Sequence, residues 1–418
     1  MKDCLILAYK FRNFALQLHT PIFLSQGIHM SRNNYVYLLL NMAALAAFGP
    51  FVTDFYLPAL PDIQILFDTT TSRVQLSITF SLIGLAFGQL IMGPLSDKYG
   101  RKPILLLSLL LFVLSTIACL LSWDIYSFLV FRLIQGIAGS GGIVISKSVV
   151  ADLFEGEDLA KFFALLGAIQ GLAPIIAPVL GGIMLRYTDW HGIFSVLLGI
   201  GIVLCVSMLF FKESLPATNR IKGSFLESFA FWHILKNKEF MLYVILQSFA
   251  MGIMFSFIAS SSFIFQTHFG LSGFWYSLCF AGAAFSITLG ASVTPIFKNE
   301  RLALCIGVIG LFICGLGLCV LLQCNPSLFL TELGFGITLV FLGFILPTST
   351  ALAMEMERSN AGNASAILGF SFFTFGGVLS PLTGIGDNMF ASVGAVIALC
   401  CLGVGIFGYI VLRKPHLR

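Results

Sequence analysis

Gly93-Pro94-Leu95-Ser96-Asp97-Lys98-Tyr99-Gly100-Arg101-Lys102-Pro103 is the stretch of sequence on which the interpretation of this chain rests. It lies between two long apolar runs, from Val74 to Met92 and from Ile104 to Leu121. Each run is long enough to cross a hydrocarbon core of ~30 Å as a helix. The stretch is therefore predicted to be a tight, charged loop that joins two membrane-spanning helices.

The composition of the whole chain agrees with that prediction. Of 418 residues, 58% are hydrophobic and 10% are charged, whereas soluble domains have ~45–50% apolar and ~25% charged residues. A soluble chain of this length would lack the charges to cover its surface. Because a lipid-exposed backbone must satisfy its own hydrogen bonds, the apolar runs are assigned to α-helices.

Twelve such spans are predicted, and the fold class is an all-α polytopic membrane protein with two six-helix bundles. The first six spans are Tyr35–Leu57, Val74–Met92, Ile104–Leu121, Ile125–Ile145, Phe162–Leu185 and Ile193–Phe211. The last six are Phe240–Phe265, Phe274–Phe297, Leu302–Leu322, Leu328–Thr350, Ala364–Ile385 and Met389–Leu412. The expected parts are an N-terminal tail (1–34), a first bundle (35–211), a linker (212–239), a second bundle (240–412) and a C-terminal tail (413–418).

The basic residues predict the orientation of the chain. If the two termini share one side, 20 Lys and Arg lie in the segments on that side and two, Arg73 and Arg186, lie in the opposite loops. Cytoplasmic loops of membrane proteins carry such an excess. Both termini and the loop at Gly93 are therefore expected in the cytoplasm. Met30 is an alternative start of the chain.

Two polar residues inside the spans are candidates for function. An ionisable side chain at the bilayer centre costs ~2.5–3.5 kcal/mol on insertion scales, so it is rare without a role. Asp54 lies near the end of the first span and is followed by Pro58 and Pro61, which weaken the helix. We expect Asp54 to bind and release protons; the alternative is an Asp at the outer interface.

Arg132 lies in the fourth span, with Gln135 and Gly136 one turn further on the same face. An arginine keeps its charge, so it needs an anionic or multiply hydrogen-bonding partner. A buried functional role is expected, and the alternative is a side chain that reaches the outer headgroups. Glu332 and Asp387 are expected at the membrane interface and are assigned no role.

The fifth span of each half mixes small residues with proline. Pro174, Pro178, Gly181 and Gly182 fall in the first half, and the run from Gly369 to Gly384 falls in the second. Small residues allow close helix packing, and proline bends a helix. The equivalent placement favours a transporter built from repeats over ordinary packing.

Other classes of function have little support. The six His residues are scattered without metal-ligand spacing or a catalytic partner, and no Cys-x-x-Cys pair indicates a metal site. No phosphate-binding loop precedes a Lys-Ser or Lys-Thr pair, which disfavours an ATP-driven pump. The chain is not expected to be an enzyme, to hold a cofactor or metal, or to bind nucleic acid.

The motifs described above resemble those of the major facilitator superfamily. The stretch from Gly93 to Lys102 is similar to the signature between helices 2 and 3 of that superfamily, and Arg132-x-x-Gln135-Gly136 resembles its fourth-helix motif. The run from Ala173 to Gly182 resembles the fifth-helix motif of its antiporters, with Ala in place of two glycines. Asp54-Phe-Tyr-Leu-Pro58 resembles the first helix of bicyclomycin-resistance (Bcr/CflA) drug:proton antiporters.

This resemblance implies proton-driven efflux of small amphiphilic or antibiotic-like compounds across the bacterial inner membrane by alternating access. It implies that Asp54 binds the proton and that Arg132 modulates it. A substrate cavity between the bundles is expected, bordered by Asp54, Tyr56 and Gln135. The resemblance also implies that Pro174, Pro178, Gly181 and Gly182 form an antiporter hinge; the chain is expected to act as a monomer with a small-molecule substrate, protons and the lipid bilayer as partners.

Two alternatives remain for the activity. One is an uptake transporter of the same fold that imports a small metabolite with protons. The other, more distant, is a non-transporting membrane receptor, for which the short loops offer no partner domain.

The polar stretch at Gly93 is interpreted as a conformational latch. Gly93 and Gly100 allow close approach and a tight turn, and Asp97 and Arg101 are expected to link the cytoplasmic ends of helices, with Asp152 as partner. The family resemblance places this cluster against the second bundle when a transporter faces outward.

Overall fold

The computed structural model describes residues 22–23, 29–30, 32–220, 231–297, 299–357, 361–386 and 388–413. Within these residues the regular structure is helical, apart from a two-residue antiparallel pair, β1 (Ile22–Phe23) and β2 (His29–Met30), near the N-terminus. Asp387, most of the N-terminal tail, residues 221–230 of the linker and residues 414–418 lie outside the described residues. Twelve of the described helical segments are long and apolar enough to cross a membrane, as the sequence predicts.

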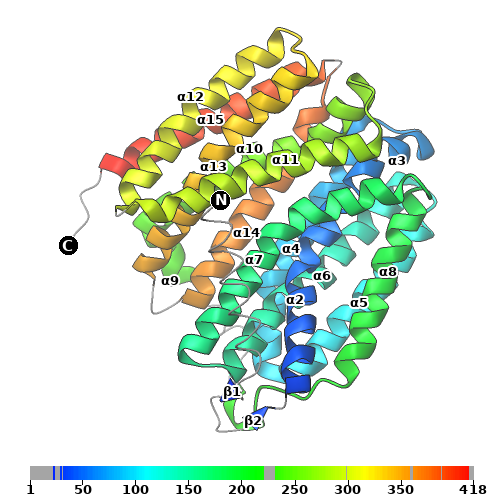
Figure 1. Ribbon diagram of the computed structural model, residues 1–418, viewed down its shortest axis with the longest axis vertical. Helices are drawn as coiled ribbons and strands as arrows, with labels where there is room; N and C mark the ends of the chain where they lie inside the picture. Colours follow the sequence, from blue (N-terminus) through cyan, green and yellow to red (C-terminus); the bar gives the residue numbers. More distant parts are fainter. Residues whose placement is uncertain are drawn as a thin grey trace, which may run out of the picture.

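The first half of the chain contains the helices α2 to α8 (Figure 1). Their bounds are α2 (Arg32–Asp54), η1 (Leu57–Ala59), α3 (Leu60–Leu66), α4 (Thr71–Tyr99), α5 (Arg101–Leu120), α6 (Ile125–Leu153), α7 (Gly156–Met184) and α8 (Trp190–Leu209). The short η2 (Ala217–Asn219) and α9 (Phe231–Leu235) lie in the connection to the second half.

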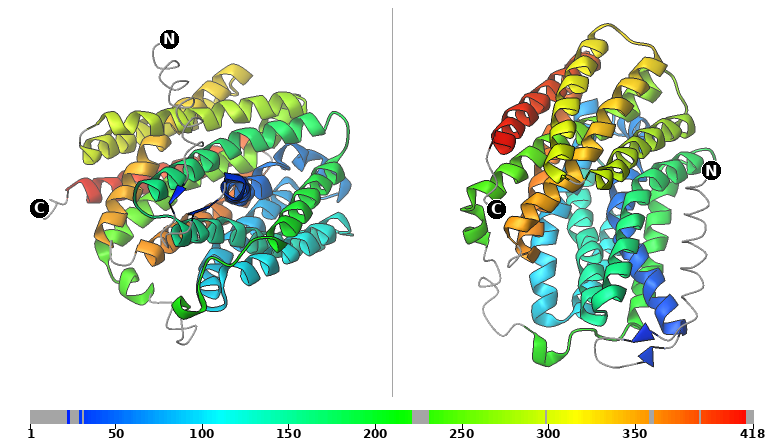
Figure 2. Two further views of the ribbon diagram at one scale, coloured as in Figure 1. Left: turned by 60° about the horizontal axis from the view of Figure 1, so that its bottom comes forward. Right: turned by 60° about the vertical axis from the view of Figure 1, so that its left-hand side comes forward.

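The second half contains the helices α10 to α15. Their bounds are α10 (Lys238–Ser262), η4 (Phe263–His268), α11 (Gly273–Val293), η5 (Thr294–Ile296), α12 (Glu300–Gln323), α13 (Leu328–Met356), α14 (Ala361–Leu379), η7 (Ser380–Gly384) and α15 (Met389–Arg413). The two halves lie side by side (Figure 2).

The polar stretch at Gly93 is not the loop that the sequence predicts. Helix α4 continues through Gly93, Pro94 and Asp97 to Tyr99, and α5 begins two residues later at Arg101. Gly100 alone forms the turn, with φ 107° and ψ 153°, a conformation that is nearly exclusive to glycine. Asp97 therefore lies on the last turns of one helix, and Arg101 is the first residue of the next.

Two other helix ends differ from the prediction in ways that affect the candidate site. Helix α6 extends to Leu153 instead of Ile145, so Asp152 lies on its last turn and not beyond it. Helix α2 ends at Asp54, and the chain then passes through η1 and α3, where Pro58 and Pro61 lie at the first turns. The predicted weakening of the helix after Asp54 is present as a break.

The halves contact each other through two pairs of long helices. Helix α4 packs against α14, and α7 packs against α11. In each pair, the second spanning helix of one half meets the fifth spanning helix of the other. This reciprocal pairing is the arrangement expected of two repeats related by an axis along the membrane normal.

Hydrogen bonds between the halves gather at one end of the molecule, which we call the Leu57 end. Ser262 and Gln266 donate to the carbonyl oxygens of Leu57 (2.8 Å) and Pro58 (3.0 Å). From α4, the side chains of Ser72, Gln75 and Thr79 donate to the carbonyl oxygens of Pro381, Ala259 and Gly377, at 2.9, 3.0 and 2.7 Å. We call the opposite end, where α4 turns into α5, the Gly100 end.

Candidate functional site

Asp54 lies inside the protein at the point where α2 breaks. Its side chain is 5% exposed, and the next residues, Phe55 and Tyr56, are almost fully buried. Two side chains of the second half, those of Ser262 and Gln266, hold the carbonyl groups of the η1 turn that follows. A movement of the second half would therefore displace the turn next to the Asp54 carboxyl group.

Arg132 is fully buried and contacts the chain on both sides of Asp54, at the end of α2 and in the turn that follows. One guanidinium nitrogen donates to the carbonyl oxygen of Val52 at 2.9 Å, and the ring centroid of Tyr56 lies 4.2 Å from the guanidinium carbon. A second nitrogen donates to Gln135, while Nε has no hydrogen-bond partner. These contacts place the cation beside the backbone and ring that flank Asp54 rather than on its carboxylate.

Gln135 and Tyr56 extend this network to two neighbouring helices. The Gln135 amide donates to the Thr116 hydroxyl of α5 at 2.7 Å, and the Tyr56 hydroxyl lies 2.9 Å from that of Ser77 of α4. Both side chains are fully enclosed, so in this conformation they do not border open space. Their expected contact with a substrate stays a prediction, whereas their contact with Arg132 is direct.

Sequence reasoning missed Tyr276, which brings the second half to this site. Tyr276 of α11 is fully buried, lies in the neighbourhood of Asp54, and has its hydroxyl 3.2 Å from that of Ser261. The run Ser260-Ser261-Ser262 within an apolar span was the available signal, because adjacent hydroxyls in a membrane helix need partners.

The residues expected to form a hinge lie where α7 meets two other helices. Helix α7 is continuous through Pro174 and Pro178. A Cβ atom at Gly181 would lie 2.0 Å from the carbonyl oxygen of Phe55, and one at Gly182 would lie 2.2 Å from the Ser277 hydroxyl of α11. These glycines therefore allow α7 to approach both the Asp54 break and the second half.

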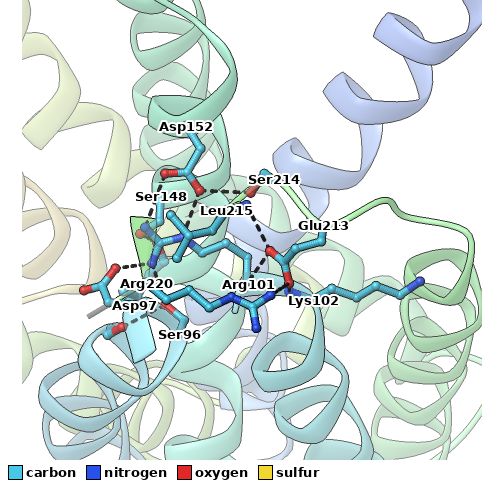
Figure 3. A network of polar contacts seen from close by, with 12 residues as sticks. Ser96, Asp97, Arg101, Lys102, Ser148, Asp152, Glu213, Ser214, Leu215 and Arg220 are labelled. Carbon is cyan, nitrogen blue, oxygen red and sulfur yellow. Dashed lines mark hydrogen bonds and ion pairs between the residues drawn. The ribbon is translucent and has the colours of Figure 1, made fainter. Parts of the chain in front are cut away.

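The predicted latch residues form a charged cluster at the Gly100 end (Figure 3). Arg101 forms ion pairs with Asp97 and with Asp152, the latter at 2.9 Å, and also donates to Ser96 at 2.8 Å. Gly93 packs loosely against Val144 of α6, 3.4 Å from where its Cβ would be. These partners of Arg101 belong to the first half, so among the described residues the cluster makes its contacts there rather than with the second half.

The cluster also includes residues after α8 that the sequence did not indicate. Glu213 accepts hydrogen bonds from the backbone N–H groups of Arg101 (2.9 Å) and Lys102 (3.2 Å) at the start of α5, and Arg220 lies 3.7 Å from its carboxylate. Ser214 donates to Asp152 at 2.9 Å. The segment 213–220 thus ties the latch to the linker between the halves. Among the described residues, no three His, Cys, Asp or Glu side chains are grouped as metal ligands.

Comparison with known proteins agrees with the fold and the motifs. The sequence profile of the Major Facilitator Superfamily matches residues 39–381. The chain is 35% identical to the uncharacterized MFS-type transporter YdgK of Bacillus subtilis over 90% of this chain and 95% of that protein. It is 26% identical to the bicyclomycin resistance protein homolog of Haemophilus influenzae (94% and 99% covered) and 28% identical to the multidrug resistance protein MdtL of Citrobacter koseri (78% and 83% covered).

Solved structures share the fold at low sequence identity. A bacterial homolog of the human lysosomal transporter Spinster, in an inward-facing and unoccupied conformation, matches with a TM-score of 0.72 and 16% identity over 90% of this chain and 97% of that one. A D-xylose–proton symporter matches with a TM-score of 0.67 and 15% identity, over 88% and 97% of the two chains.

Proposed function

Because the chain belongs to the major facilitator superfamily and is a multi-pass membrane transporter, we propose that it exports small amphiphilic or antibiotic-like compounds in exchange for protons. The relatives named for multidrug and bicyclomycin resistance cover most of the chain and support this substrate class. We place the protein in the bacterial inner membrane, as a monomer that needs no cofactor and draws its energy from the proton gradient.

The position of Asp54 carries this proposal. It is an enclosed carboxyl group within a membrane span, at a helix break that contacts the second half. A proton on Asp54 removes a buried charge, and a change of packing at the break alters the contacts between the halves. Proton binding and the arrangement of the halves are therefore linked, as coupled transport requires.

The charge distribution assigns the two ends of the molecule. With both termini in the cytoplasm, as the excess of Lys and Arg predicts, the Gly100 end is cytoplasmic and the Leu57 end faces outward. The hydrogen bonds at the Leu57 end then close the outer side. From this closure we infer an inward-facing conformation, which a compound would enter from the cytoplasm.

Everted inner-membrane vesicles test the proposal. A proton gradient that is acidic inside is expected to drive uptake of radiolabelled bicyclomycin, or of a compound chosen from the resistance profile of a hypersusceptible host. Asp54→Asn, present at the same level, is expected to lower this gradient-driven uptake at least tenfold. Asp68→Asn is the matched control, because Asp68 is exposed in a turn at φ 42° that asparagine tolerates.

Two results would contradict the proposal. Unchanged coupled uptake in Asp54→Asn would remove Asp54 from proton coupling. Vesicles that accumulate none of the compounds, while intact cells take up a nutrient through the same protein, would favour an uptake symporter.

A further inference from the structure

Glu332 is a carboxyl group of the second half that lies deeper than its sequence position indicates. It is the fifth residue of α13, close to the start of that span. However, a Cβ atom at Gly282 of α11 would lie 3.2 Å from Glu332 Oε1. Gly282 is nine residues into α11, which is about 13 Å along that helix. The Glu332 side chain, which is partly buried, is therefore packed against α11 beyond the first turns of that helix.

The packing of α11 against α13 fixes this depth. A Cβ at Gly336, one turn after Glu332, would lie 3.4 Å from the hydroxyl of Ser286, one turn after Gly282. A Cβ at Gly343 would lie 2.2 Å from the carbonyl oxygen of Ile287. The two helices run side by side with small residues at the contact (Figure 1), which holds Glu332 against α11.

Glu332 has no counter-charge in this position. Its Oε2 atom is buried and has no hydrogen-bond partner. Among the described residues, Tyr276 and Cys279, both on α11, are ionisable groups in its neighbourhood. On the neighbouring helices α10 and α12, the charged residues Lys238, Glu239, Glu300 and Arg301 lie in the first turns, at the Gly100 end, and the described part of α14 has none.

An isolated carboxyl group in this setting is a candidate proton site. In the ionised state it would carry an unpaired charge with an unsatisfied oxygen inside the membrane, which is costly. A proton removes the charge and turns the acceptor into a hydroxyl donor. No cationic side chain among the described residues offers the alternative of an ion pair.

Tyr276 connects Glu332 with Asp54. Its fully buried side chain lies in the neighbourhood of both carboxyl groups. One of these is in the first half and the other in the second, and Tyr276 lies on α11, the helix that packs against α7 of the first half. Tyr276 thus lies near one acid of each half, at the contact between the halves.

We propose that Glu332 is a second proton-binding site, so that the transporter carries two protons per cycle, one on Asp54 and one on Glu332. The proton is taken up by the Glu332 carboxylate from water on the outer side and released from the carboxyl group to water on the cytoplasmic side. This proposal rests on the proposed proton-driven export for its place in the cycle, but proton binding by Glu332 is testable without transport.

Infrared difference spectra of the purified protein between about pH 5 and about pH 9 test proton binding directly. Exposed carboxyl groups are ionised across this range, because their pKa values lie near 4, so the band of protonated carboxyl groups reports enclosed acids. Glu332→Gln is expected to remove about half of the band, Asp54→Asn a similar share, and the double variant nearly all of it. Glu332→Met, an apolar residue of similar length, is the second variant in case Gln impairs folding.

Glu300→Gln is the matched control, because Glu300 is an exposed acid at the start of α12; it is expected to leave the band unchanged. A band that keeps its full size in both Glu332 variants would overturn the proposal. So would loss of transport for cationic compounds with an unchanged band, since Glu332 would then bind the compound and not a proton.

Proton counting in vesicles places the site in the cycle. The number of protons moved per exported compound, obtained from the opposing gradient that stops net flux, is expected to fall twofold in Glu332→Gln. An unchanged ratio would overturn the two-proton cycle. Wild-type protein without proton-driven export would instead contradict the proposed function, while the infrared band would still decide whether Glu332 binds a proton.

Discussion

Arg132 shows why a single buried charge is tolerated in this protein. Two of the three guanidinium nitrogens donate to a backbone carbonyl and an amide side chain, and the group lies over the face of an aromatic ring, without a carboxylate in direct contact. A planar cation with several donors suits such a site, whereas an ammonium group does not. Its contacts at Val52 and Tyr56 hold the backbone on either side of Asp54, so we regard Arg132 as a positioning residue.

Arg132→Lys is expected to slow export about 10- to 100-fold at equal protein level. Lysine keeps the charge but cannot reach Gln135 and Val52 together, and a hydrogen bond to a charged group contributes about 1.5–3 kcal/mol. The initial rate of efflux and its pH profile measure the effect, because displaced contacts around Asp54 would shift the profile. Arg73→Lys, at an exposed site 6.0 Å from the Tyr126 ring, is the control; equal rates in both variants would contradict the role of Arg132.

A side chain at Gly100 is excluded by a neighbouring side chain as well as by the backbone conformation. A Cβ atom there would lie 2.5 Å from the Glu213 carboxylate, in addition to the cost of about 1–3 kcal/mol for a side chain in this glycine-only conformation. Gly100→Ala is therefore expected to lower the melting temperature in detergent and to slow export. Gly156→Ala is the comparison, since Gly156 has φ 58° and open space around its Cβ position. A melting temperature for Gly100→Ala no lower than that of Gly156→Ala would show that the contact with Glu213 contributes nothing.

At this scale the sequence predicted the residues that contrast with their surroundings. Asp54 and Arg132 stand out as polar residues in apolar runs, and Asp97, Arg101 and Asp152 flank the ends of spans. Tyr276 and Glu213 do not stand out in the same way. A tyrosine is common in membrane helices, and a glutamate that follows a span is typical of a solvent-exposed loop. Their roles arise from contacts across 112 residues (Glu213 with Arg101) or between the halves, which no local pattern encodes.

At the scale of whole helices, α7 is one of the two elements of the first half that pack against the second half. Gly182→Leu is expected to force α7 away from Ser277 of α11, because a Cβ alone would lie 2.2 Å from that hydroxyl. The Leu57 end would then close poorly, and export should fall at least tenfold with protein still in the membrane. Gly171→Leu on the same helix, where nothing lies within 4 Å of the Cβ position, is expected to behave as wild type. Similar rates for the two variants would argue against close approach at Gly182.

Helix α8 offers a test of pH dependence outside the membrane. Asp189 accepts a hydrogen bond from the backbone N–H of His191 at 3.0 Å and caps the helix, and the hydrogen bond from the His191 side chain lowers the pKa of Asp189. Since the folded pKa is depressed, the cap is fully present above about pH 4 and is lost as pH falls through the folded value. Asp189→Ala is expected to cost about 1 kcal/mol at neutral pH, and the difference in melting temperature from wild type should shrink in acid. A constant difference would exclude the carboxylate as the cap.

The apolar runs predicted the existence of the spanning helices better than their ends. Hydropathy marks the residues that lie in hydrocarbon, but backbone hydrogen bonding continues each helix into the polar region. Helix α4 therefore runs to Tyr99 rather than Met92, and α6 to Leu153 rather than Ile145. For the same reason, the predicted loop at Gly93 is a continuation of the helix that is followed by one turn residue. Proline and glycine do not prevent this, because both are tolerated within membrane helices.

For the whole molecule, the contacts between the halves imply a cycle in which one end opens as the other closes. The Leu57 end is closed by side chains of α4 that donate to backbone carbonyls of the second half. At the Gly100 end, the charged cluster has its contacts in the first half and in the segment 213–220. The sequence predicted two halves from their repeated fifth spans, but the pairing of α4 with α14 and of α7 with α11 depends on how the repeats face each other, which only the folded chain reveals.

A disulfide across the Leu57 end tests this cycle. Thr79 donates to the carbonyl oxygen of Gly377 at 2.7 Å, and a Cβ atom at Gly377 would be in ordinary contact, 3.4 Å from the Thr79 carbonyl oxygen, so these neighbouring positions are chosen for a cysteine pair. Oxidation of the pair Thr79→Cys and Gly377→Cys is expected to reduce export at least tenfold, because the halves could no longer separate there, and reduction should restore it. The chain has ten native cysteines, so wild type and each single variant are oxidised in parallel and should keep their rates. Export at the wild-type rate by fully cross-linked protein would mean that the Leu57 end does not open during transport, and alternating access between these two ends would be wrong.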